Sequence, residues 1–151
     1  MFTRCSCLFL LVSLLGGCFQ QDDDKTSQIL PSDYKSSYVL ARNCRYSTSH
    51  ARFIKVLTNN VETNDSYMAG NCLLPVNSLV LAEEYDSSAC TTLTGYTLMY
   101  KNAGYDTSHN DWRWQKLDET RNVLEDGRVQ ACIDCHLKCS QPTNPEYTCS
   151  R

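Results

Sequence analysis

The sequence predicts an α+β fold in which an antiparallel sheet dominates and a few short helices are added. Short apolar segments alternate with polar residues at a period of two, which is typical of strands. Clusters of Gly, Asn and Asp separate these segments, and such clusters indicate turns. No internal repeat, coiled coil or phosphate-binding glycine loop is found. With 151 residues, 42% of them hydrophobic, the chain is long enough for one domain with one core.

Four segments carry the strand pattern most clearly, namely 52–59, 78–85, 92–101 and 112–119. In the last of these, Trp112, Trp114 and Lys116 fall on one face because side chains alternate along a strand. The polar stretch 59–70 predicts a turn or a short helix that ends at Gly70. Residues 103–111 predict a turn, and 120–136 predict a short helix with a break at Gly127.

The N-terminus predicts export. Residues 8–17 form an apolar run of about ten residues, too short for a bilayer, which needs about 20. We therefore interpret 1–17 as a signal peptide. Its end, Leu15-Gly16-Gly17-Cys18, resembles the bacterial lipobox, in which the cysteine is lipidated. An ordinary signal peptide that happens to precede a cysteine is the alternative.

The polar, acidic stretch 18–33 predicts a tether that holds the domain, 34–151, away from the membrane. Phe19 rather than Asp after the lipidated cysteine favours the outer membrane, so we expect the periplasmic face of that membrane. In such an oxidising compartment disulfides persist. The net charge of −3 and the lack of a basic patch argue against a nucleic-acid partner.

The stretch Cys132-Ile133-Asp134-Cys135-His136 matches C-x-x-C-H, the attachment motif of c-type haem. Two thiols one helical turn apart can add to the two vinyl groups of haem, and the adjacent histidine can ligate the iron. We therefore predict one covalent haem c, held by Cys132 and Cys135, with His136 as the proximal ligand. Catalytic residues beyond these are not predicted.

Two other interpretations of the motif remain open. Zinc could be held by Cys132, Cys135 and Cys139, with either His136 or Cys149 as the fourth ligand. These ligands crowd together along the chain, however, and exported thiols oxidise. The motif could also belong to a disulfide framework only. In that case the protein would be a disulfide-stapled surface lipoprotein that acts by interaction, without haem.

Several blocks of the chain resemble the cytochrome P-460 family and its relative cytochrome c′-beta. The matching blocks are "SLVLAEEYD", "GYTLMYKNAGYD", "NDWRWQKLD" and "CIDCHLKC", and the likeness spans most of 44–149. This resemblance implies a P-460-like sheet with a few helices, a homodimer as is usual in the family, and five-coordinate iron. It further implies binding of nitric oxide or a similar small ligand, or oxidation of a nitrogen compound such as hydroxylamine.

The chain departs from the family pattern at one position. Cytochrome P-460 cross-links a lysine to the porphyrin, but the matching position, just before Glu83, is Ala82. This favours the gas-binding relatives over hydroxylamine oxidation. The family's carboxylate beside the distal pocket aligns near Gly127, where Glu125 and Asp126 stand, although a solvated turn is the simpler interpretation.

A sixth iron ligand would instead make the protein a six-coordinate electron carrier with a periplasmic redox partner. The possible donors are Met68, Met99, His50 and His109. Core packing is the default role of a methionine on a strand such as Met99. His50 follows "CRYSTS" near a strand start and could line the haem edge or bond locally.

Five cysteines remain once Cys5, Cys7, Cys18 and the motif pair are set aside, and sequence alone leaves their connectivity open. Five thiols allow two bridges. We expect Cys139–Cys149, which would close a short loop worth on the order of 3 kcal/mol. Cys44–Cys90 is our second expectation. Cys72 would then stay outside the bridges, most simply as a buried, inert thiol.

Overall fold

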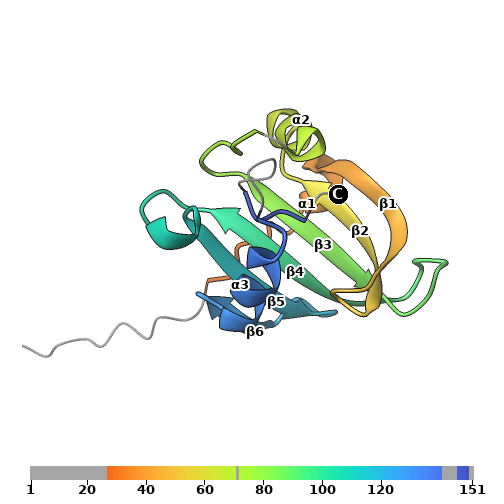
Figure 1. The fold of residues 1–151 in the computed structure, drawn as a ribbon. Coiled ribbons are helices and arrows are strands. Elements are labelled where there is room, and N and C mark those ends of the chain that lie inside the picture. The colour runs from red at the N-terminus through yellow and green to blue at the C-terminus, as the bar shows by residue number, and fades with distance from the viewer. Residues whose placement is uncertain (1–26, 71, 141–145, 150–151) are drawn as a thin grey trace, which may run out of the picture.

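The computed structural model describes residues 27–70, 72–140 and 146–149 (Figure 1). The predicted signal peptide, the lipid site at Cys18 and the tether up to residue 26 lie outside the described residues. No helix among the described residues is both long enough and apolar enough to cross a membrane.

A six-stranded antiparallel sheet forms the body of the protein, and its strands follow one another in chain order. The strands are β1 (Val39–Ser47), β2 (Arg52–Thr58), β3 (Leu79–Tyr85), β4 (Leu93–Lys101), β5 (Trp112–Asp118) and β6 (Val123–Gly127). The helices are α1 (Tyr34–Ser37), α2 (Val61–Ala69), the 3₁₀ turn η1 (Thr107–His109) and α3 (Gln130–Leu137). The predicted antiparallel α+β class is therefore confirmed.

The four predicted strands are β2 to β5, and the two outer strands were missed. In β1 the pairing with β2 shifts between Leu40 and Arg42 and again between Arg42 and Arg45, so its side chains do not alternate cleanly. In β6 the sequence VLEDG is short and has no fully buried residue. Glu125 and Asp126 thus lie on a strand, and the expected solvated turn is wrong.

Local signals explain where the helices begin and end. The Asn60 side chain accepts a hydrogen bond from the Thr63 amide at 2.7 Å and caps α2. Gly70 ends α2 with φ 68°, a left-handed conformation that glycine adopts without strain. Gly127 ends β6 with φ 105°, and α3 begins three residues later. The predicted break at Gly127 is therefore confirmed.

One face of the sheet is closed by the N-terminal part of the described chain. Leu30 and Tyr34 are buried there against the sheet, and Figure 1 shows α1 behind the strands. Their partners are Leu79, Leu81, Tyr96, Leu98 and Leu117. The Ile29 amide also donates to Gln115 Oε1 at 2.9 Å. Residues 27–33, which the sequence assigned to the tether, are therefore packed on the folded domain.

The opposite face carries α3, which Figure 1 shows in front of β4 to β6. Ile133 on α3 is buried against it, in a cluster with Trp112, Trp114, Met99 and Val80. The cluster covers only part of this face, and the remainder borders the cavity described below.

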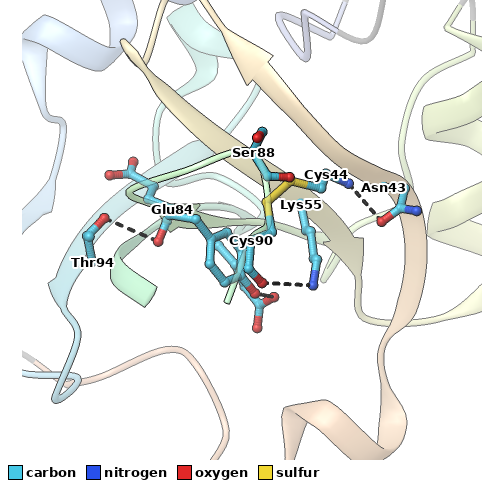
Figure 2. The surroundings of a disulfide bond; sticks show 9 residues. Asn43, Cys44, Lys55, Glu84, Ser88, Cys90 and Thr94 are labelled. Carbon is cyan, nitrogen blue, oxygen red and sulfur yellow. Dashed lines mark hydrogen bonds between the residues drawn. A yellow bond between two sulfur atoms is a disulfide. The ribbon is translucent and has the colours of Figure 1, made fainter. Parts of the chain in front are cut away.

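Both expected disulfides form. Cys44 on β1 joins Cys90 in the β3–β4 connection with a Cα–Cα distance of 6.0 Å (Figure 2). Cys139, just after α3, joins Cys149 with a Cα–Cα distance of 5.0 Å. Cys72 lies outside both bridges, as expected, but it is exposed, so the expectation that it is buried is wrong.

Candidate functional site

A cavity of about 730 Å³ lies between α3 and the sheet face that α3 partly covers. Its floor comes from alternate residues of neighbouring strands, because these point to the same face. The floor residues are Ile54, Val56, Val80, Ala82, Glu84, Thr97, Met99, Trp114 and Lys116. The volume falls within the roughly 300–1,000 Å³ of pockets that hold small molecules and cofactors.

The predicted haem motif lines this cavity. Cys132, Cys135 and His136 all border it, and they come from one face of α3. Their spacing explains this, since residues three and four apart lie on the same side of a helix. Ile133, between them, is buried and fixes α3 on the sheet. The three motif residues are thus brought to the cavity together.

Three groups contact the His136 ring, and one of them is the Cys149 sulfur, which lies 3.7 Å from Nδ1. The same Nδ1 lies 2.5 Å from the Tyr147 carbonyl oxygen. Because a carbonyl can only accept, Nδ1 must carry the proton, which leaves Nε2 with a lone pair. The Trp114 ring packs edge-on with its centroid 4.6 Å away. Burial lowers the pKa of His136, although the hydrogen bond to Tyr147 opposes this. The imidazole is therefore kept neutral, as a metal ligand must be.

Cys132 lies in a half-buried position beside Lys116. Burial raises the pKa of its thiol, and the positive charge of Lys116 opposes that rise. A buried thiol with a raised pKa is protonated at neutral pH and is slow to react by itself. Attachment of a group at Cys132 would thus need an external factor that activates the thiol, because the residue is not a reactive thiolate by itself.

A polar cluster forms another part of the cavity wall. His50 Nδ1 lies 3.2 Å from Glu84 Oε1, and Thr97 Oγ1 donates to the same oxygen at 3.3 Å. Arg52 Nε lies 3.5 Å from Glu84 Oε2. Burial by itself would raise the pKa of Glu84, but these partners outweigh it and the net pKa is lowered. Glu84 is therefore a charged carboxylate that orients His50, and sequence reasoning missed it.

Lys116 also lines the cavity. Ala82 on β3 pairs with Thr97 on β4, and Thr97 pairs with Lys116 on β5. Ala82 and Lys116 therefore belong to one row across the sheet. The Lys116 amine donates to Glu125 Oε1 at 2.7 Å, which raises the pKa of Lys116. Only the strand register shows that Lys116 shares a row with Ala82.

Of the four residues predicted as possible sixth iron ligands, two line the cavity and two do not. Met99 and His50 line the cavity, whereas Met68 and His109 do not. Met68 is exposed on α2, and His109 Nδ1 lies 2.8 Å from Asp106 Oδ2. His50 Nδ1 is occupied by Glu84, so its Nε2 is the nitrogen left for a ligand in the cavity.

The two predicted carboxylates of β6 take part only indirectly. Glu125 contacts the cavity through its bond to Lys116. Asp126 forms an ion pair with the half-buried Arg113. Neither carboxylate lines the cavity.

The donors present fit a haem better than a zinc ion. Cys139 and Cys149 are joined to each other, so two of the possible thiolate ligands are consumed. Within residues 27–70, 72–140 and 146–149, no group of three or more His, Cys, Asp or Glu side chains is placed to hold a metal ion. By contrast, haem needs two thiols, one neutral imidazole and an apolar wall, and all of these border the cavity.

Comparison with known proteins adds no identification. Neither a scan against protein-family models nor a search of curated proteins finds a match. The P-460 resemblance therefore stays a prediction that rests on the quoted sequence blocks.

Proposed function

We propose that this chain is an exported, lipid-anchored monohaem c-type cytochrome of the P-460 type, which binds nitric oxide or a similar small ligand. One observation carries the proposal. The side chains of Cys132, Cys135 and His136 all border the same cavity, and that cavity is large enough for a cofactor.

The residues of the cavity have distinct roles in this proposal. Cys132 and Cys135 hold the porphyrin through thioether bonds, and the Nε2 atom of His136 ligates the iron. When bound, the haem supplies an iron centre that can take a gaseous ligand or exchange an electron. Val80, Met99 and Trp114 exclude water from the floor. His50, oriented by Glu84, can exchange a proton with a protic nitrogen ligand.

A second function is favoured by the same histidine. His50 lines the cavity with its Nε2 left over, so it could serve as a sixth iron ligand in an electron carrier. Met99 is the other donor on this wall. Under this alternative the ferrous protein would not bind carbon monoxide readily. His50→Ala and Met99→Leu would change the optical spectrum only if the residue removed is the ligand.

The decisive experiment is an optical spectrum of the full chain, expressed in bacteria that carry the c-type maturation system and extracted in mild detergent. We expect covalent haem on a denaturing gel, and a high-spin ferrous spectrum that shifts with carbon monoxide. Cys132→Ala/Cys135→Ala should abolish covalent haem. Cys72→Ala is the matched control and should retain it, because Cys72 does not line the cavity.

The alternatives give different results in the same experiment. A ferrous spectrum that carbon monoxide leaves unchanged would favour the electron carrier. The lack of covalent haem in the wild-type protein would refute both haem functions and favour a disulfide-stapled interaction protein. Incorporation of labelled fatty acid, lost in Cys18→Ala, tests the lipid anchor. Sedimentation of the extracted protein tests the expected homodimer.

A further inference from the structure

Glu146, the first residue of the described segment 146–149, is buried to an unusual degree for a carboxylate, with 1% of its surface exposed. Its Oε1 accepts from the Lys101 amine at 2.5 Å and from the Leu74 amide at 3.2 Å. Its carbonyl oxygen accepts from Trp112 Nε1 at 3.0 Å. Both the side chain and the backbone of Glu146 are therefore fixed to separate parts of the domain.

The next residue carries the carbonyl that binds His136. Tyr147 and Cys149 have φ values of 60° and 50°, in the left-handed region that such residues rarely adopt. A backbone of this kind persists only where its surroundings impose it. The surroundings here are the Glu146 anchor on one side and the Cys139–Cys149 disulfide on the other. That disulfide ties the segment to the end of α3, the helix that carries His136.

Stability alone does not account for the Glu146 ion pair. A buried ion pair contributes little net stability, because desolvation offsets the attraction. Glu146 Oε2 is also buried without a hydrogen-bond partner among the described residues, which is unfavourable. What the pair does provide is a fixed position for the residue that precedes Tyr147.

We propose that the segment 146–149 positions His136, with Glu146 as the positioning residue and the Cys139–Cys149 disulfide as its second anchor. Held in place, the Tyr147 carbonyl keeps the proton on Nδ1, fixes the ring plane and directs the Nε2 lone pair to the cavity. Such a partner also makes the imidazole a stronger electron donor. The effect on the iron's redox potential rests on the proposed function, whereas the effect on the tautomer and orientation of His136 does not.

The test measures His136 in two forms of the full chain. In the haem-free form (Cys132→Ala/Cys135→Ala), ¹⁵N-histidine NMR reports which ring nitrogen carries the proton. The chain has three histidines, so His50→Gln and His109→Gln assign the signals. In the haem-loaded form, the midpoint potential reports the donor strength of the ligand. We expect wild-type His136 to show a protonated Nδ1.

Glu146→Ala should change both readouts. The ¹⁵N signals should become those of mixed tautomers. The potential should rise by about 59 mV, the equivalent of a tenfold change in the ferric-to-ferrous ratio for one electron. Glu146→Gln should restore wild-type values, because an amide oxygen can still accept both bonds. If Glu146→Ala does not fold, Cys139→Ser/Cys149→Ser releases the other end of the segment. This variant should also show mixed tautomers and a raised potential.

Cys44→Ser/Cys90→Ser is the matched control, since it removes a disulfide that does not border the cavity. It should leave both readouts unchanged. Two results would overturn the proposal: unchanged tautomer signals in Glu146→Ala and in the Cys139/Cys149 variant, or an equal change in the control. A glutamine variant as altered as the alanine variant would also count against it. Failure of haem attachment would refute the proposed function, yet the haem-free NMR test would still decide this inference.

Discussion

Glu83 and Glu84 are neighbours in sequence but lie in opposite environments. Glu83 points to the closed face, where it is 6% exposed and accepts hydrogen bonds from the Tyr34 and Tyr85 hydroxyls, both at 2.6 Å. Glu84 points to the other face and lines the cavity together with His50. The two carboxylates differ only in the side of the strand they occupy, so the sheet itself separates a structural carboxylate from one available to a ligand.

The difference between the faces arises from what covers each of them. The closed face is filled by residues 27–38 of the same chain, and the Tyr34 hydroxyl from this segment donates to the buried Glu83 carboxylate. Burial and the hydrogen bond to Glu83 accordingly raise the pKa of Tyr34. The other face is covered by α3 and the segment 146–149, and these leave a hollow lined by the motif residues. We therefore expect substitutions on the closed face to alter stability and those on the cavity face to alter binding.

The largest effect on stability should come from the centre of the closed face. Leu81 is fully buried there, at 0% exposed. Leu81→Ala should lower the free energy of unfolding by about 2–5 kcal/mol, because it removes buried methyl groups and leaves a cavity. Urea unfolding followed by tryptophan fluorescence measures this. Leu124→Ala, at a position 63% exposed, is the control and should change it by less than about 0.5 kcal/mol. Equal effects would contradict the assignment of the core.

The Glu83 cluster should give the next largest effect. Tyr34→Phe removes one of the two hydroxyl donors to a buried carboxylate. A hydrogen bond to a charged group contributes about 1.5–3 kcal/mol, so we expect a loss of that size in the same urea experiment. Tyr38→Phe is the matched control, because its hydroxyl makes no hydrogen bond to another described residue and its side chain is only half-buried. A loss below about 0.5 kcal/mol for Tyr34→Phe would show that the N-terminal segment is held by apolar contacts alone.

This contrast shows what the sequence can and cannot predict. The alternation in 78–85 identifies β3 and already implies that Glu83 and Glu84 face opposite sides. The C-x-x-C-H spacing likewise places its three residues on one side of a helix. Such properties are local, because they depend on residues a few positions apart. Both disulfides could also be anticipated, although Cys44 and Cys90 are 46 residues apart and their meeting depends on the sheet.

Properties that depend on register or on distant partners could not be read from the sequence. Lys116 shares a row with Ala82 only because β3, β4 and β5 pair in one particular register. Glu146 lies in a polar, proline-containing stretch that predicts irregular structure, and its burial requires Lys101 from the end of β4. β1 was missed because register shifts break its alternation. In each case the deciding contact is far away in the chain.

The pH dependence of stability should distinguish the cavity carboxylate from an ordinary one. The folded state lowers the pKa of Glu84, so its ionised form is stabilised by folding. This contribution is present above the unfolded pKa of about 4.3 and is lost as pH falls toward the folded pKa. Glu84→Gln should therefore be less stable than wild type near pH 6, and the gap should narrow below about pH 4. Urea unfolding at a series of pH values measures it.

Glu119→Gln supplies the comparison for this pH series, because Glu119 is an exposed carboxylate near the β5–β6 turn. Its free energy of unfolding should stay close to that of the wild type at every pH. A gap between Glu84→Gln and wild type that widens in acid would contradict the proposed pairing of Glu84 with His50, Thr97 and Arg52.

The smallest effect is expected at Lys116, whose side chain is 33% exposed and pairs with a 44% exposed Glu125. Exposed ion pairs contribute about 0.2–1 kcal/mol and are screened by salt. Lys116→Met should thus lower stability only slightly at low salt, and by less at 1 M salt, where the screening length is about 3 Å. Lys35→Met, on the short helix α1, is the control for loss of one surface charge. A loss well above 1 kcal/mol that salt does not reduce would mean that Lys116 supports the cavity floor as part of the core. In that case the cavity face at β5 would contribute to stability as well as to ligand binding.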